Sequence, residues 1–151
     1  MKNIPRVYLD VCALNRLFDD QQQMRIRLET DAILLILKFI QEGTLQLVFS
    51  RVHLLEIAAN PTENRREHIE NLVLRYGITP DVQLDEVRTR TEWLIRRGLG
   101  VADAAHVAFA EAMRASFVSV DDRLLKQCQR AKLSIWCGNP IAYCDKEKLG
   151  I

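Results

Sequence analysis

Residues 6–16 read RVYLDVCALNR, an apolar run that is interrupted by Asp10 and then continues as far as Asn15. The run over residues 7–9 is typical of a short buried strand. A carboxylate at the end of a buried strand is costly unless a partner side chain or a metal ion compensates its charge. We therefore expect such a partner to come from elsewhere in the sequence.

The composition is that of a folded protein rather than a disordered one. Of the 151 residues, 48% are hydrophobic and 27% are charged, which is ordinary for a globular chain long enough to bury a full core. We expect a single domain over residues 1–151. The formal net charge of +1 provides no overall basic field, so any contact with nucleic acid would have to come from local patches.

No segment is expected to cross a membrane. The longest apolar run, residues 32–37 (AILLIL), is far too short to span a bilayer, and the first residues contain no signal-peptide core. We therefore expect a cytoplasmic protein. The cysteines contain no C-x-x-C pair, and in such a protein we expect reduced core residues rather than zinc ligands or disulfides. They are Cys12, Cys128, Cys137 and Cys144.

Strand and helix patterns alternate along the chain. Strands are expected at residues 7–9, 45–50, 117–120 and 133–137, and helices at residues 24–41, 52–60, 62–77, 82–97, 101–113 and 122–132. A polar loop is expected after the first strand, and an irregular tail passes through Pro140. This alternation favours an α/β protein with three layers, α/β/α, and a central, mainly parallel sheet.

Four carboxylates are placed where such a sheet would bring them together. In an open parallel sheet, functional residues collect beyond the carboxyl ends of the strands. Asp10 and Asp121 each follow an apolar strand, Glu56 lies one short turn after the second strand, and Asp103 begins a helix. Asp122 precedes RLLK and is expected to cap a helix, which leaves Asp121 as the better candidate ligand.

A cluster of carboxylates needs a counter-charge. Two like charges about 4 Å apart repel by about 4 kcal/mol at an effective dielectric constant of about 20. A hard divalent cation, Mg²⁺ or Mn²⁺, prefers oxygen ligands and would relieve that repulsion. Such an ion can activate a water for attack on a phosphodiester, so the pattern favours a nuclease.

Each candidate also has a structural interpretation. Asp103 is equally compatible with a helix cap or a dipole partner, and Glu56 with a solvated helix face. Asn15 is equally compatible with a turn. The histidines are expected to be packing or surface residues, and no H-E-x-x-H motif occurs. Basic helix residues, among them arginine pairs at 65–66 and 96–97, are compatible with phosphate contacts or with solvated faces.

The sequence resembles the PIN-domain proteins, the ribonuclease fold shared by VapC-type toxins of bacterial toxin-antitoxin systems. Four segments carry the resemblance in family order and spacing: VYLDVCALNR, SRVHLLEIAANP, VADAAHVAFA and FVSVDDRLL. The resemblance covers nearly the whole chain. It implies that Asp10, Glu56, Asp103 and Asp121 form the catalytic and metal-binding site, with Asp122 in a neighbouring position that some members also use.

The same resemblance implies an endoribonuclease that uses Mg²⁺ or Mn²⁺ and cleaves RNA such as tRNA, rRNA or mRNA. It also implies a homodimer and a small antitoxin that holds the enzyme inactive. Cys12 stands where family members often carry Thr or Ser, which removes a strong hydrogen-bond donor. Ser119 keeps the hydroxyl that is common at its position, and Asn15 lies where it would meet the substrate, so both are candidate substrate-binding residues.

Two other functions stay open. A phosphoacceptor receiver also gathers acids at strand ends, but it needs an acceptor Asp at the end of a middle strand, where this chain has Ser50 and Arg51. A PIN-like domain that has lost catalysis would bind RNA or protein only. The presence of all the acids disfavours such a loss, whereas Cys12 is compatible with it.

Overall fold

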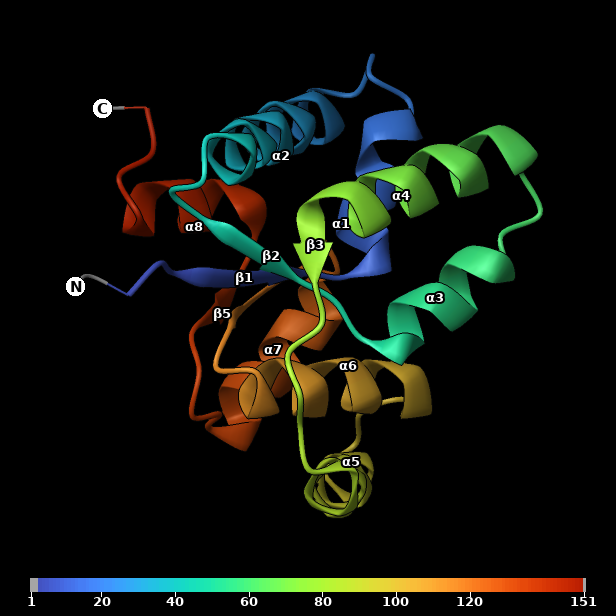
Figure 1. The fold of residues 1–151 in the computed structure, drawn as a ribbon, viewed down its shortest axis with the longest axis vertical. Helices are drawn as coiled ribbons and strands as arrows, with labels where there is room; N and C mark the ends of the chain where they lie inside the picture. The colour runs from blue at the N-terminus through green and yellow to red at the C-terminus, as the bar shows by residue number, and fades with distance from the viewer. Residues whose placement is uncertain (1–2, 151) are drawn as a thin grey trace.

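A five-stranded parallel sheet forms the centre of the protein in a computed structural model, which describes residues 3–150 (Figure 1). The strand order is β3-β2-β1-β4-β5, and every neighbouring pair is parallel. The strands are β1 (Arg6–Leu9), β2 (Gln46–Val48), β3 (Gly77–Ile78), β4 (Ser116–Val118) and β5 (Cys137–Gly138). The predicted α/β class with a mainly parallel central sheet is therefore confirmed.

Helices cover both faces of this sheet and give the three layers (Figure 1). Helices α2, α4 and α8 lie on one face, and α5, α6 and α7 lie on the other. The helical elements are α1 (Val11–Asn15), η1 (Arg16–Phe18), α2 (Met24–Gln41), α3 (Arg51–Ala58), α4 (Glu63–Tyr76), α5 (Leu84–Arg96), α6 (Val101–Ala112), α7 (Asp122–Ala131) and α8 (Pro140–Lys146). Among residues 3–150, no helix combines the length and apolar character needed to span a bilayer.

The alternation of side chains along β1 divides the core into two clusters. Val7 and Leu9 pack with residues of α2, α4 and α8, whereas Tyr8 between them packs with residues of α5, α6 and α7. Successive side chains of a strand point to opposite faces, so a central strand covered on both faces is apolar throughout. This is why RVYL carries no alternation of apolar and polar residues.

Four parts of the chain differ from the sequence-based expectation. A strand was expected at residues 133–137, but the strand that pairs with β4 is only β5, Cys137–Gly138. Residues 11–18 form α1 and η1 where a loop was expected, because the Asp10 side chain accepts the Ala13 N–H and caps a short helix. β3 was not predicted, since two residues carry no periodic pattern. The expected irregular tail contains α8, which begins with Asn139 as its cap and Pro140 in its first turn.

Candidate active site

The carboxylate of Asp10 lies at the carboxyl end of β1 and is buried, with 3% of the residue exposed. Its backbone N–H donates to the Val118 oxygen at 3.1 Å, which extends the β1–β4 pairing by one step. Its Oδ1 accepts the Ala13 N–H at 2.8 Å. Burial raises the pKa of Asp10 to about 6, opposed by hydrogen bonds from Ser119 and Ala13. The structure thus holds a carboxylate whose charge is poorly compensated.

Ser119 and Asp121 follow β4 on the same edge of the sheet. Ser119 is completely buried; its oxygen accepts the Asp121 N–H at 3.1 Å, and its hydroxyl bonds Asp10. The expectation that Ser119 contacts substrate stays a prediction. Asp121 is the third residue after the end of β4 rather than the first.

The helix cap at this point is Asp121 and not Asp122. The Asp121 Oδ1 accepts the N–H groups of Arg123 at 3.0 Å and Leu124 at 3.2 Å. Asp122 is the first residue of α7, is exposed, and pairs with Arg25 at 2.8 Å. The assignment of the cap to Asp122 was therefore wrong. Capping uses only one carboxylate oxygen of Asp121, so the other remains available to a ligand.

Glu56 and Asp103 reach the same region from α3 and α6. The Glu56 Oε1 is hydrogen-bonded to the buried His106 Nε2, and a third of the Glu56 side chain is still exposed. Asp103 is half-buried in the first turn of α6, whose N-cap is Gly100. Burial raises the pKa of Asp103, and the charges of Asp121 and Glu56 raise it further. The cap interpretation of Asp103 is thus wrong.

The charges of Asp10, Glu56, Asp103 and Asp121 all act on the Cys12 thiol, and we call these four residues the acidic cluster. Burial and the charge of each of the four raise the pKa of the Cys12 thiol to about 12. Coulombic effects fall with distance, so their joint action on one sulfur places all four near it. Cys12 is exposed, so its prediction as a core residue was wrong. All four cysteines are free, as predicted.

A cleft of about 630 Å³ opens beside the acidic cluster. Acidic and basic side chains both line this cleft. The polar and charged residues among them are Cys12, Asn15, Arg16, Asp19, Glu56, Asn60, Arg65 and Asp121. The cleft therefore joins a negatively charged region to side chains that can donate hydrogen bonds to phosphate oxygens.

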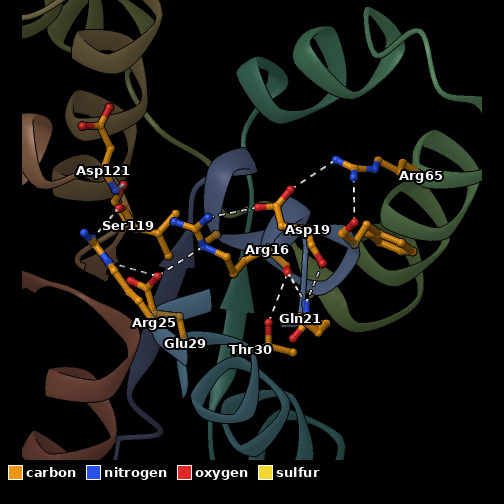
Figure 2. A network of polar contacts seen from close by, with 12 residues as sticks. Arg16, Asp19, Gln21, Arg25, Glu29, Thr30, Arg65, Ser119 and Asp121 are labelled. Carbon is orange, nitrogen blue, oxygen red and sulfur yellow. Dashed lines mark hydrogen bonds and ion pairs between the residues drawn. The ribbon is translucent and has the colours of Figure 1, made fainter. Parts of the chain in front are cut away.

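The two arginines of the cleft, Arg16 and Arg65, belong to a network of ion pairs (Figure 2). Asp19 lies between Arg16, at 3.1 Å, and Arg65, at 3.4 Å. The buried carboxylate of Glu29 forms ion pairs with Arg16 at 3.2 Å and with Arg25 at 3.5 Å. Figure 2 shows these residues in one chain from α4 across η1 to α2. Arg16 was not predicted as a site residue, because its place in the cleft depends on the η1 turn.

The sequence matches the PIN domain family over residues 7–129, a span that contains the whole acidic cluster. The chain belongs to the PIN domain family. PIN domains are generally nucleases and usually use divalent metal ions.

A solved structure supports the same fold. It is described as the crystal structure of PAE2754 from Pyrobaculum aerophilum, with 17% sequence identity and a TM-score of 0.53. The alignment covers 95% of this chain and 89% of that one. At this identity the likeness concerns the fold alone. No curated protein matches the chain.

The donors of this PIN domain suit a hard divalent cation. Carboxylate oxygens are the ligands that Mg²⁺ and Mn²⁺ prefer. Burial, together with the charges of neighbouring acids, raises the pKa values of Asp10 and Asp103, and a bound cation would oppose that rise. Within residues 3–150, no three His, Cys, Asp or Glu side chains are already arranged to hold an ion. Glu56 is turned to His106, so the ligand set stays a prediction.

Alkylation of Cys12 tests the arrangement of this PIN domain directly. We expect Cys12 to react slowly with iodoacetamide at pH 8 although it is exposed, because only the thiolate is nucleophilic. Asp121→Asn removes one of the charges that raise its pKa and should accelerate the reaction. The rate is followed on the Cys12 peptide by mass spectrometry. Equal rates for the wild type and Asp121→Asn would show that Asp121 does not lie near Cys12.

Proposed function

We propose that the protein is a metal-dependent endoribonuclease that hydrolyses phosphodiester bonds in RNA. The observation that carries the proposal is the acidic cluster, whose four members come from distant segments and act on one thiol at the mouth of a cleft. Mg²⁺ or Mn²⁺ would be held by Asp10, Glu56, Asp103 and Asp121. When bound, the ion would activate a water and polarise the phosphodiester.

The remaining residues of the cleft would bind and orient the RNA. Asn15, Arg16 and Arg65 line the same cleft as Glu56 and Asp121, and arginine contacts to phosphates position a nucleic acid without reading its sequence. Ser119 would act through Asp10 and Asp121, which it contacts. These roles support RNA as the substrate.

The decisive experiment is a cleavage assay on purified full-length protein with labelled RNA in Mn²⁺, Mg²⁺ or excess chelator. We expect cleavage that requires the divalent ion and falls at least about a hundredfold in Asp103→Asn, as when a preorganised charged group is removed from an active site. Asp85→Asn is the matched control, because Asp85 is an exposed acid in the first turn of α5. Activity that survives chelation, or that persists in Asp103→Asn, would contradict the proposal.

We further propose that the enzyme is a VapC-like toxin that forms a homodimer and is held inactive by a small antitoxin. Exposed apolar side chains on α2 and α3 support a protein partner. They include Met24, Leu28 and Leu34 on α2, and Leu54 and Leu55 on α3. Light scattering of the purified protein tests the dimer. Loss of RNA cleavage on adding the product of an adjoining short gene tests the antitoxin.

The alternative is a PIN domain that binds RNA or protein without catalysis. Cys12 at the usual hydroxyl position is the observation that favours it, because a thiol is a weak hydrogen-bond donor. If this alternative holds, we expect the protein to bind RNA in a gel-shift assay and to cleave no RNA in the presence of any divalent ion. Cys12→Ser would then be expected to gain cleavage.

A further inference from the structure

A chain of buried polar groups leads from the start of α3 to the carboxylate of Glu56. The Ser50 Oγ and the Tyr8 Oη are 2.7 Å apart, and the Tyr8 Oη is 2.6 Å from the His106 Nδ1. The other ring nitrogen of His106, Nε2, contacts Glu56 Oε1. Tyr8, Ser50 and His106 are each at most 2% exposed, so water does not compete for these groups.

The hydrogen bonds between these side chains are all donated in one direction, from Ser50 towards Glu56. The Ser50 Oγ already accepts the Val52 N–H at 3.2 Å, so its own proton is free to go to the Tyr8 oxygen. Tyr8 then donates to the His106 Nδ1, and the proton of His106 lies on Nε2, directed at Glu56. In the reverse direction the Ser50 proton would have no acceptor among residues 3–150, at a cost of about 1–3 kcal/mol for a buried donor.

The contacts of His53 support this direction. The Ser50 N–H donates to the His53 Nδ1 at 3.1 Å, which leaves the His53 Nε2 proton for the Leu9 oxygen at 2.7 Å. His53 thereby connects Ser50 to the end of β1. These two hydrogen bonds hold the first group of the hydrogen-bonded series in place.

We propose that Ser50, Tyr8 and His106 form a positioning relay that fixes the carboxylate of Glu56 for the reaction of the acidic cluster. The relay rests on the proposed nuclease function. It connects the elements that carry the acids: Tyr8 lies two residues before Asp10, Ser50 caps the helix of Glu56, and His106 lies one turn after Asp103. None of its members needs to touch the substrate.

Tyr8→Phe tests the relay because it removes the hydroxyl group and keeps the aromatic ring. We expect a fall in kcat of about ten- to a hundredfold, the range seen when a group that orients a metal ligand is removed, with KM for RNA changed less than about twofold. The affinity for Mn²⁺, measured by calorimetry, should fall as well. Tyr143→Phe is the matched control, because Tyr143 is also completely buried and its hydroxyl has no partner in the described part of the chain.

A conservative replacement separates positioning from packing. His106→Gln retains an N–H donor near the position of Nε2 and should keep more activity and more Mn²⁺ affinity than His106→Ala. Equal losses in the two variants, at equal thermal stability, would overturn the relay.

The tautomer of His106 can be measured directly in the wild-type protein. Long-range ¹H–¹⁵N NMR of the wild type should show a neutral ring with the proton on Nε2, and Tyr8→Phe should shift this signal while Tyr143→Phe leaves it in place. A proton on Nδ1 would overturn the relay.

The experiments distinguish a failure of the relay from a failure of the proposed function. A wild type that cleaves RNA, with Tyr8→Phe indistinguishable from Tyr143→Phe in kcat and Mn²⁺ affinity, overturns the relay and leaves the nuclease in place. A wild type that cleaves no RNA, with the Nε2 tautomer and an Mn²⁺ affinity that depends on Tyr8, overturns the ribonuclease and supports the relay.

Discussion

Asp10→Asn is expected to abolish RNA cleavage and at the same time to stabilise the protein. The loss should be at least about a hundredfold, because a charged group of the proposed site is removed. Asn keeps an oxygen that accepts the Ala13 N–H, so the cap of α1 survives. What disappears is the buried charge, whose cost is seen in the rise of the pKa of Asp10 from 3.8 to about 6.

The pH dependence of this effect has a defined sign. The pKa of Asp10 is higher in the folded than in the unfolded chain, so the folded state binds more protons between about pH 4 and 6 and wild-type stability falls as the pH rises through that window. The stability of Asp10→Asn should not fall in this way, because Asn carries no ionisable group. At pH 7 it should therefore be more stable than the wild type by up to about 3 kcal/mol, and at pH 4 the difference should vanish.

Urea unfolding at pH 4 and pH 7 measures both values. Asp31→Asn is the control, because Asp31 is an exposed acid on α2 and its replacement should change neither activity nor stability. Saturating Mn²⁺ should stabilise the wild type at pH 7 and Asp10→Asn much less, because a ligand stabilises the state that binds it. A less stable Asp10→Asn at pH 7 would show that the buried charge is already compensated by the protein.

The long elements of the fold could be predicted because their patterns repeat. Helix α2 was predicted with both ends as observed, from apolar residues at the helical period and from Gly43 beyond its end, where φ is +82°. β1 and β4 were recognised as short apolar runs. β3 and α8 were missed, because the pairing of Gly77 with Leu47 across the sheet and the two residues that mark the start of α8 produce no periodic signal.

The acids could be chosen from topology, but their contacts could not. Parallel strands bring their carboxyl ends to one edge, so Asp10 and Asp121 were expected to lie together. Which of Asp121 and Asp122 caps α7 depends on where the backbone enters the helix, and adjacent acids are equivalent in a sequence pattern. The contact of His106 with Glu56 arises from the packing of α3 on α6, which no local pattern contains.

Glu29→Ala is expected to destabilise the protein by about 3 kcal/mol, the cost of removing one partner of a buried ion pair. Glu29 is 2% exposed and is paired with Arg16 and Arg25. The N–H of Arg16 Nε forms no hydrogen bond with well-aligned geometry, so Arg16 is bound mainly by charge. Without Glu29, the Arg16 guanidinium stays largely buried, with only Asp19 to compensate it.

The same change should reach the active site, because the network is part of the wall of the cleft. Arg16 connects Glu29 to Asp19, and Asp19 connects to Arg65 on α4 (Figure 2). We expect Glu29→Ala to raise KM for RNA more than it lowers kcat, since Arg16 and Arg65 in the cleft lose their support, while Asp10 and Asp121 stay beyond the ends of β1 and β4, Glu56 on α3 and Asp103 on α6.

A matched variant isolates burial as the cause. Glu92 pairs with Arg88 four residues earlier on α5, as Glu29 pairs with Arg25 on α2, but more than half of the Glu92 side chain is exposed. Exposed pairs of this kind contribute about 0.3–0.5 kcal/mol, so Glu92→Ala should change the free energy of unfolding by no more than that. Equal losses in the two variants would show that the Glu29 network is an ordinary surface pair, and that the wall of the cleft does not depend on it.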